Sequence, residues 1–308
     1  MKALVTGGAG FIGSNITKLL LDEGHDVVIL DNLSTGYRSN LDSLPGAAFV
    51  EGNIRDHELV SEIMRKVDVV FHLAASVGNR RSIDNPILDS QVNVIGTLNV
   101  LDAARDAGVK KIVYSSSAGI FGELKHLPIA EDHPTEPDTP YGVSKLAAEK
   151  LCLVYAHLYP MDAVCLRYFN VYGVNQRYDA YGNVMPIFVR WLLSGEPLVI
   201  YDDGEQTRDF VNVQDVARAN LLAAQAEGVS GAFNIASGTA ITINRLAELM
   251  RGMGEEDVGV AFQPPRKGDV RHSLADISLA ESVLGYRPRV DIESGLKEYI
   301  AWAAKEMV

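Results

Sequence analysis

The fold is decided by one stretch near the start of the chain, Thr6-Gly7-Gly8-Ala9-Gly10-Phe11-Ile12-Gly13. A short apolar run precedes it and a helical pattern follows it. In such a turn Gly7 allows the tight bend, Gly10 lets the backbone approach a pyrophosphate, and Gly13 lets the helix pack closely on the strand. The start of the helix also offers free N–H groups and the positive end of its dipole to phosphate oxygens. The stretch therefore predicts a dinucleotide-binding turn.

An acidic residue ends the second apolar run at a distance that suits this interpretation. Asp31 lies eighteen residues after Gly13, where a carboxylate can accept hydrogen bonds from the hydroxyl groups of an adenosine ribose. No arginine directly follows Asp31 to bind a 2′-phosphate, although Arg38 lies somewhat further along the chain. The pattern therefore favours NAD over NADP as the cofactor.

Short apolar runs alternate with longer helical patterns through the first half of the chain. Because each run is apolar throughout, we expect strands that are covered by helices on both faces. Repeated β-α-β units predict a doubly wound parallel sheet of the Rossmann type, which is an α/β fold. The predicted strands are Lys2–Val5, Asp26–Leu30, Ala48–Val50, Asp68–Leu73, Lys111–Ser115 and Ala163–Tyr168, and the predicted helices are Ile12–Glu23, Asp56–Lys66, Asp89–Ala107 and Tyr141–Leu158.

The rhythm changes after about residue 170, where Gly, Pro and Asn become frequent and the apolar runs shorten. We expect this part of the chain to form a smaller α/β lobe that binds the substrate. The predicted division places residues 1–170 in the NAD-binding Rossmann domain, with residues 208–228 packing back onto it. Residues 171–207 and 229–308 are then expected to form the second lobe.

Composition excludes several classes of partner. Hydrophobic residues make up 47% of the 308 residues and charged residues 22%, which are ordinary values for a globular protein. A formal net charge of −12 argues against binding to nucleic acid or to an anionic membrane surface. Cys152 and Cys165 lie in apolar surroundings and are expected to be reduced core thiols, and the seven scattered histidines predict no metal site. With no apolar run long enough to cross a membrane, we expect a cytoplasmic protein.

A second motif, Tyr141-Gly142-Val143-Ser144-Lys145, begins a predicted helix. The spacing of four places Tyr141 and Lys145 on one helical face, about one turn apart. Because a tyrosine has a reference pKa of ~10, we hypothesise that the ammonium group and the positive nicotinamide of NAD⁺ lower the pKa of this phenol. The hydroxyls of Ser115–Ser117 follow the fifth predicted strand, and ligands of open parallel sheets bind at the carboxyl ends of the strands.

These motifs together resemble the extended short-chain dehydrogenase/reductase family, and within it the UDP-sugar 4-epimerases of the UDP-glucose/galactose type. The resemblance covers nearly the whole chain. It implies that Ser117 holds the sugar 4-hydroxyl, that Tyr141 is the catalytic base and that Lys145 binds the nicotinamide ribose. The residues that carry it are Thr6–Gly13, Asp31-Asn32, His72-Leu73-Ala74-Ala75, Ser115–Ser117, Tyr141 with Lys145, Leu166–Asn170 and Arg208-Asp209-Phe210.

The resemblance also implies two sets of contacts. NAD is expected to contact Gly7, Gly10, Phe11, Ile12, Gly13, Asp31, Asn32, Ser34, Thr35, Gly36, Asn53, Ile54, Leu73, Ala74, Ala75, Asn93, Ser115, Tyr141, Lys145 and Tyr168. The UDP-sugar is expected to contact Val77, Ser116, Ser117, Asn170, Asn183, Val184, Val199, Tyr201, Arg208, Arg266, Asp269 and Ser273. Two departures from the family pattern are Asn53, where Asp is usual, and Phe121, where Tyr is usual.

The residues after Ser117 distinguish between related reactions. Sugar 4,6-dehydratases resemble this family with Asp-Glu at this point, and UDP-glucuronate decarboxylases with Glu, because their second step needs such a group. Here Ala118 and Gly119 follow, and this predicts a C4 epimerase. The resemblance implies UDP-Glc and UDP-Gal as its sugars, and we expect UDP-GlcNAc and UDP-GalNAc to be accepted as well. A UDP-glucuronate 4-epimerase stays an alternative, because Arg80 or Arg81 could pair with a uronate. An NDP-sugar 4,6-dehydratase or decarboxylase is the remaining alternative.

Two further expectations concern activity and assembly. A non-catalytic NAD-binding scaffold on this fold would be expected to lack Tyr141 or Lys145, and both are present. The family commonly pairs through helices equivalent to Asp89–Ala107 and Tyr141–Leu158, so the resemblance implies a homodimer. The apolar faces of these two helices could equally be packed on the sheet.

A substitution at position 273 tests the expected sugar range. The resemblance aligns Ser273 with a bulky tyrosine found near the sugar C2 substituent in glucose/galactose-restricted relatives, so the serine would leave space for an N-acetyl group. We predict that Ser273→Tyr lowers kcat/KM for UDP-GlcNAc at least about tenfold while conserving turnover of UDP-Glc. Steady-state kinetics on both sugars measure this, and an equal loss on both would contradict the expectation.

Overall fold

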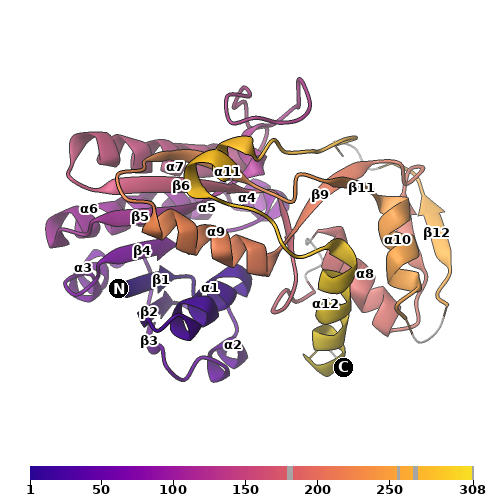
Figure 1. Ribbon diagram of the computed structural model, residues 1–308, viewed down its shortest axis with the longest axis horizontal. Helices are drawn as coiled ribbons and strands as arrows, with labels where there is room; N and C mark the ends of the chain where they lie inside the picture. Colours follow the sequence, from indigo (N-terminus) through magenta and orange to yellow (C-terminus); the bar gives the residue numbers. More distant parts are fainter. Residues whose placement is uncertain (179–182, 255–256, 266–269, 307–308) are drawn as a thin grey trace.

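A seven-stranded parallel sheet is the centre of the computed structural model, which describes residues 1–178, 183–254, 257–265 and 270–306 (Figure 1). Its strand order is β10-β6-β5-β4-β1-β2-β3, and every neighbouring pair is parallel. This arrangement confirms the predicted doubly wound sheet. The strands are β1 (Lys2–Thr6), β2 (Asp26–Asp31), β3 (Ala48–Glu51), β4 (Val69–His72), β5 (Lys111–Ser117), β6 (Asp162–Tyr168) and β10 (Gly231–Ile235).

Helices cover both faces of this sheet, so successive residues of a strand enter different cores. In β1, Ala3 and Val5 pack into the core that includes α1 and α9, whereas Leu4 packs into the opposite core with residues of α3, α6 and α7. This double burial explains why the strands are apolar throughout. The helices are α1 (Phe11–Asp22), α2 (Arg38–Asp42), α3 (His57–Met64), α6 (Thr97–Ala107), α7 (Pro140–Leu158) and α9 (Val213–Gln225), and a short 3-10 turn, η2 (Ala118–Ile120), follows β5.

The predicted helix Asp89–Ala107 is not one regular helix. The structure divides this region into α5 (Pro86–Ser90), the π-helical turn η1 (Gln91–Gly96) and α6, with α4 (Asn79–Asp84) before them. Gly96 lies against Ile54 so closely that a β-carbon there would be 2.5 Å from the Ile54 Cδ1. The Thr97 hydroxyl donates to the carbonyl of Asn93 at 2.6 Å. Periodicity did not reveal the change at η1 because the apolar residues keep a helical spacing on both sides of this turn.

The second half of the chain returns to the large sheet twice. The first return is α9, which packs against α1, β5 and β6. The second is β10, which pairs with β6, and α11 (Ser278–Leu284) packs on it. The assignment of residues 229–308 wholly to the second lobe was therefore wrong for β10 and α11. An apolar strand placed beside β6 gains ladder hydrogen bonds and covers an otherwise open sheet edge.

The remaining elements gather at one end of the large sheet (Figure 1). They begin directly after β6, since β7 starts only two residues after Tyr168. Their core includes Phe188, Phe210 and Tyr299. They comprise a sheet of order β11-β9-β7, a parallel pair β12-β8 and three helices: β7 (Asn170–Tyr172), α8 (Val184–Leu193), β8 (Leu198–Tyr201), β9 (Thr207–Asn212), β11 (Ala240–Thr242), α10 (Ile243–Arg251), β12 (Val260–Gln263) and α12 (Ile292–Glu306).

The structure also bears on the two cysteines and on the question of a membrane-spanning helix. Cys152 and Cys165 both lie in the core with free thiols, as expected. Within the described ranges, no helix combines the length and apolar character that crossing a lipid bilayer requires.

Candidate active site

The glycine turn after β1 is shaped by contacts that exclude side chains. Gly7 has a φ of 72°, which glycine adopts at little cost. A β-carbon at position 13 would lie 2.2 Å from the Gly7 carbonyl oxygen and 2.8 Å from the Gly8 Cα. Gly10 precedes α1 without a capping side chain, so the N–H groups at the start of that helix stay available to phosphate oxygens. The turn therefore fits the pyrophosphate of a dinucleotide.

Asp31 ends β2 beside this turn and is 8% exposed. Its Oδ2 accepts a hydrogen bond from the Ala9 N–H at 3.0 Å, and its Oδ1 accepts one from the Leu33 N–H at 2.8 Å. Burial raises the pKa of this carboxyl group, although both N–H donors act to lower it. A β-carbon at Gly36 would lie 3.1 Å from Asp31 Oδ1, so the 34–36 segment lies against the carboxylate. Each oxygen retains a lone pair that suits a ribose hydroxyl.

The loops after β4 and β3 lie at the same carboxyl edge of the sheet as the glycine turn and Asp31. The Leu73 and Ala74 N–H groups donate to the Thr6 hydroxyl oxygen at 3.2 and 3.1 Å, so the predicted 73–75 segment lies beside the glycine turn. Asn53 follows β3, and its Oδ1 accepts from the Arg55 N–H at 3.0 Å. The neighbouring Ile54 is buried in the core. The structure thus gathers the predicted cofactor residues of four loops at one edge of the sheet.

Tyr141 is placed beside Ser117 by a close backbone contact. Thr139 caps α7 by accepting a hydrogen bond from the Gly142 N–H at 3.2 Å. A β-carbon at Gly142 would lie 2.4 Å from the carbonyl oxygen of Gly119, so the first turn of α7 is pressed against η2. The Ser117 hydroxyl oxygen accepts from the Gly119 N–H at 3.1 Å and also hydrogen-bonds to Tyr141. A serine hydroxyl and a phenol therefore meet at the end of β5.

Burial shifts the pKa values of Tyr141 and Lys145. Desolvation raises the pKa of Tyr141 to about 12, despite the opposing hydrogen bond from Ser117. Desolvation also lowers the pKa of Lys145 to about 8. The Lys145 ammonium donates to the Ser115 carbonyl and lies 4.4 Å from the centre of the Tyr114 ring. In the protein without a cofactor, burial outweighs the Ser117 hydrogen bond in setting the pKa of Tyr141, and the hypothesis that Lys145 together with NAD⁺ lowers this pKa stays a prediction.

Three predicted contact residues have side chains that are hydrogen-bonded within the protein. Ser116 alternates with its neighbours along β5 and donates to the buried Glu149 at 2.7 Å, so its hydroxyl faces the core rather than a substrate. The Tyr168 hydroxyl, expected near NAD, lies 3.0 Å from Asn220 Oδ1 in α9 and also hydrogen-bonds to Ser115. Motif spacing does not show which face of a strand a residue occupies, and the expected ligand contacts of Ser116 and Tyr168 stay predictions.

Asn93, which is expected to contact NAD, is the third of these residues. Its Oδ1 accepts from the Ser76 N–H at 2.7 Å, and its Nδ2 donates to the Ser76 carbonyl at 3.0 Å. The amide therefore holds the loop after β4 in place. The π-helical turn η1 aims this side chain at the loop rather than along a regular helical face.

A cavity of about 210 Å³ opens between α8, β8 and β9. The residues that line the cavity combine polar groups with apolar and aromatic side chains, as in small-molecule sites. Six predicted substrate residues line it: Asn170, Asn183, Val184, Val199, Tyr201 and Arg208. The sequence analysis missed seven others: Ile187, Phe188, Trp191, Ile200, Gln206, Phe210 and Ile243. The spacing of Val184, Phe188 and Trp191 along one face of α8 was a usable signal.

The other predicted substrate residues either are not among the residues that line this cavity or fall outside the described residues. Val77 is 52% exposed and lies just before α4. The Ser273 N–H donates to the Thr207 carbonyl at 3.2 Å, which places it beside Arg208. Arg266 and Asp269 fall outside the described ranges.

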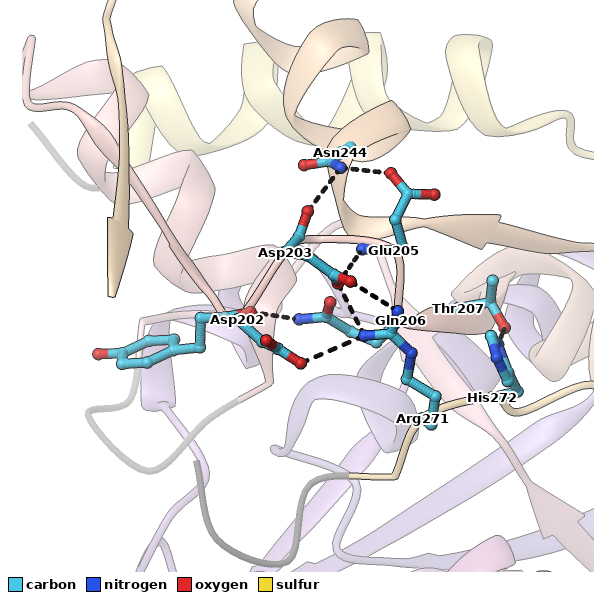
Figure 2. Close-up of polar contacts among 9 residues, drawn as sticks. Asp202, Asp203, Glu205, Gln206, Thr207, Asn244, Arg271 and His272 are labelled. Carbon is cyan, nitrogen blue, oxygen red and sulfur yellow. Dashed lines mark hydrogen bonds and ion pairs between the residues drawn. The ribbon is translucent and has the colours of Figure 1, made fainter. Parts of the chain in front are cut away.

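An ion-pair cluster joins two segments next to the cavity-lining residues Tyr201 and Gln206 (Figure 2). Arg271 donates to both carboxylate oxygens of Asp203, at 2.7 and 2.8 Å, and to Asp202 at 3.2 Å. The Arg271 guanidinium lowers the pKa of Asp203 to about 2. The Gln206 amide donates to the Tyr201 carbonyl at 2.8 Å. The cluster ties the segment that carries Ser273 to the turn between β8 and β9.

Comparison of the sequence with known proteins finds one family and relatives that are named as UDP-sugar 4-epimerases. The NAD dependent epimerase/dehydratase family matches residues 3–236 of the chain. A UDP-glucose 4-epimerase of Mycolicibacterium smegmatis is 39% identical over 97% of both chains, and a UDP-glucuronate 4-epimerase of Thermodesulfobacterium geofontis is 34% identical over 99% of this chain and 96% of its own.

Two solved structures are similar over almost their whole length. A UDP-glucose 4-epimerase of Thermotoga maritima with UDP-glucose shares 39% identity and a TM-score of 0.94, with 100% of both chains covered. A UDP-N-acetylglucosamine 4-epimerase of Methanobrevibacter ruminantium, in complex with UDP-N-acetylmuramic acid, shares 37% identity and a TM-score of 0.95 over 99% of both chains. Both likenesses extend over the large sheet and the second lobe.

Two glycine variants separate folding from cofactor binding. In Gly13→Ala the new methyl group would collide with backbone atoms, so we predict a loss of about 2–3 kcal/mol in stability together with loss of bound NAD. In Gly10→Ala the nearest atom, the Gly7 carbonyl oxygen, would be 3.2 Å away. This variant should keep nearly normal stability but lose NAD, because its methyl group occupies the approach of the pyrophosphate.

Chemical denaturation and the NAD content of the purified variants measure the two effects. Equal NAD content in wild type and Gly10→Ala would show that the pyrophosphate does not approach this turn.

Proposed function

Because the chain belongs to the NAD dependent epimerase/dehydratase family, we propose that it inverts C4 of a UDP-hexose through a transient 4-keto sugar. The observation that carries this proposal is the pairing of Ser117 with Tyr141 at the end of β5, followed by Ala118 and Gly119. These two small residues offer no carboxylate for dehydration or decarboxylation. Within the family, an epimerase needs none there.

Each residue of this group has a distinct proposed role. Ser117 holds the sugar 4-hydroxyl, and Tyr141 takes its proton and later returns it. Lys145, held by the Ser115 carbonyl, presents its ammonium group to the nicotinamide ribose. Bound NAD supplies acceptance and return of a hydride at C4. Because the oxidation and the reduction cancel, a retained cofactor suffices for repeated turnover.

The cavity is proposed to hold the nucleotide while the sugar turns over. Arg208 and Asn170 can donate to diphosphate oxygens, which suits their chemistry. Arg266 and Asp269 are proposed to contact the same nucleotide. In this division of roles residues 1–170 with 208–228 and β10 bind NAD, and the elements around the cavity bind UDP.

The proposed sugars are UDP-Glc and UDP-Gal, with UDP-GlcNAc and UDP-GalNAc also accepted. The position of Ser273 beside Arg208 supports this, because a small side chain leaves room near the diphosphate-linked sugar. The likeness to a UDP-N-acetylglucosamine 4-epimerase points the same way. Action on UDP-glucuronate is the second candidate. It is supported by Arg80 and Arg81 on α4, whose neighbour Asn79 accepts from the Thr139 hydroxyl at 3.3 Å, next to Tyr141.

A homodimer is proposed from an exposed apolar surface. Its members lie on α4, α5, η1 and α7, elements that pack on one another, and soluble monomers rarely leave so many large apolar side chains exposed together. We call this surface the α5/α7 patch: Ile83, Ile87, Leu88, Ile95, Val143, Val154 and Leu158. A second copy of the chain is the occupant that the family resemblance implies.

Product analysis tests the proposed reaction. The purified protein, with no added NAD, should convert UDP-Glc and UDP-GlcNAc to their C4 epimers, as resolved by chromatography. Tyr141→Phe should lower kcat by about 10²–10⁴-fold without weakening UDP binding. The matched control is Tyr155→Phe, which removes a phenol hydroxyl from the far end of α7 and should keep activity. Release of carbon dioxide, or a 4-keto-6-deoxy product, would overturn the proposal.

The α5/α7 patch gives a separate prediction. Ile87 is 73% exposed, so Ile87→Asp would bury a charge if the patch is an interface, at a cost of several kcal/mol. Light scattering after size exclusion should then show the mass of one chain instead of two. Phe262→Asp, a similarly exposed position on β12 outside the patch, should leave the dimer intact. A dimer that survives Ile87→Asp would exclude this face.

A further inference from the structure

A buried carboxylate lies behind the proposed catalytic residues and has no role in the scheme above. Asp89 occupies the last turn of α5 and is 1% exposed. Its Oδ2 accepts from the Ser144 hydroxyl at 2.5 Å, and its Oδ1 accepts from the Asn93 amide at 3.1 Å. Ser76 also hydrogen-bonds to this carboxylate. Burying a carboxylate costs several kcal/mol unless it is hydrogen-bonded or paired, and here each contact is to a neutral group.

Ser144 connects this carboxylate to the catalytic pair. It lies between Tyr141 and Lys145 in the first turns of α7 and is itself buried. Its hydroxyl lies 3.0 Å from the Tyr141 carbonyl oxygen and 2.9 Å from the Asn93 Nδ2. Because Asn93 also holds both backbone groups of Ser76, one network fixes the loop after β4 and the start of α7 together.

The charge of Asp89 acts on both catalytic groups. On α7 the facing titratable groups are Tyr141 and Lys145, with Glu149 two turns from the start, whereas η1 carries no charged residue. α4, which packs on α5, carries Arg80, Arg81 and Asp84. Burial is the largest influence on both groups: it raises the pKa of Tyr141 and lowers that of Lys145. The Asp89 carboxylate adds to the rise at Tyr141 and, with Cys152, Cys165 and Glu149, opposes the fall at Lys145. Lys145 in turn lowers the pKa of Asp89, although burial raises it overall.

We propose that Asp89 is a positioning residue for proton transfer at Tyr141, which holds Ser144 in place and keeps the Lys145 ammonium group charged. The inference rests on the proposed function, since it assigns Tyr141 and Lys145 to the reaction. Lys145 has no carboxylate partner of its own among the described contacts, and its ammonium donates to a carbonyl. The buried Asp89 carboxylate accepts a hydrogen bond from Ser144 of α7. Its negative charge opposes the desolvation that would otherwise favour the neutral amine of Lys145.

The first test is the pH dependence of kcat. Removing the anion lowers the pKa of both Tyr141 and Lys145, so Asp89→Asn should move both limbs of the profile to lower pH, by about one unit. Ser144→Ala removes the hydroxyl but keeps the charge, so it should lower kcat at every pH without moving the limbs. A variant that only loosened the structure would behave like Ser144→Ala. Unmoved limbs in Asp89→Asn would therefore overturn the electrostatic role.

The second test does not depend on the sugar or on turnover. NMR titration of labelled lysine side chains, with the Lys145 signal assigned by its absence in Lys145→Met, should give a pKa of about 8 for wild type and a lower value for Asp89→Asn. Asp89→Ser, which removes the same charge, is compared so that a folding defect in one variant does not decide the outcome. If both variants fail to fold, Asp89 is a folding residue and the proposal is wrong.

The two tests distinguish failure of the inference from failure of the proposed function. A protein that epimerises no UDP-sugar but shows the Lys145 shift contradicts the function and keeps the assignment of Asp89. Normal epimerisation with an unshifted Lys145 and unmoved limbs contradicts only the assignment.

Discussion

Two backbone contacts that leave no room for a β-carbon hold the site at its opposite ends. At one end Gly13 lies against the Gly7 carbonyl, and this contact shapes the turn before α1. At the other, Gly142 lies against the carbonyl of Gly119 and brings Tyr141 beside Ser117. Both contacts form at the carboxyl edge of the parallel sheet, where crossover connections deliver the strand ends. The glycine turn and Tyr141, the proposed cofactor and proton-transfer groups, therefore share one support, and the elements around the proposed substrate cavity begin directly after β6.

Desolvation shifts the pKa values of Tyr141 and Lys145 toward their neutral forms, and the neighbouring residues oppose or add to these shifts. The low-dielectric surroundings favour the neutral forms of both proposed catalytic groups, with pKa values of about 12 for Tyr141 and about 8 for Lys145. Hydrogen bonding from Ser117 favours the phenolate, and the proposed charge of Asp89 favours the ammonium. A positive nicotinamide near the phenol would act in the same direction as Ser117. The catalytic behaviour of Tyr141 is thus a property of the assembled site rather than of the Tyr141–Lys145 spacing.

The sequence was sufficient for features that depend on local pattern. The glycine turn and the six predicted strands follow from periodicity and from the order of parallel strands, whereas the association of Tyr141 with Ser117 came from the family resemblance. Features that depend on distant partners were not accessible. The pairing of β10 with β6, the π-helical turn at Asn93 and the direction of Ser116 toward Glu149 each require knowing what lies opposite. Asp89 was missed for the same reason, because Ser144 lies 55 residues away along the chain.

The fate of a label at C4 tests the central claim most directly. UDP-glucose that carries deuterium at C4 should be converted to UDP-galactose that still carries it at C4, as read by NMR and mass spectrometry of the product. Retention is required if the hydrogen leaves as hydride, is held by NAD and returns to the other face of the same carbon. Loss of the deuterium to water would show that C4 is inverted by proton abstraction, and its transfer to C6 would show a dehydratase; either result would contradict the account.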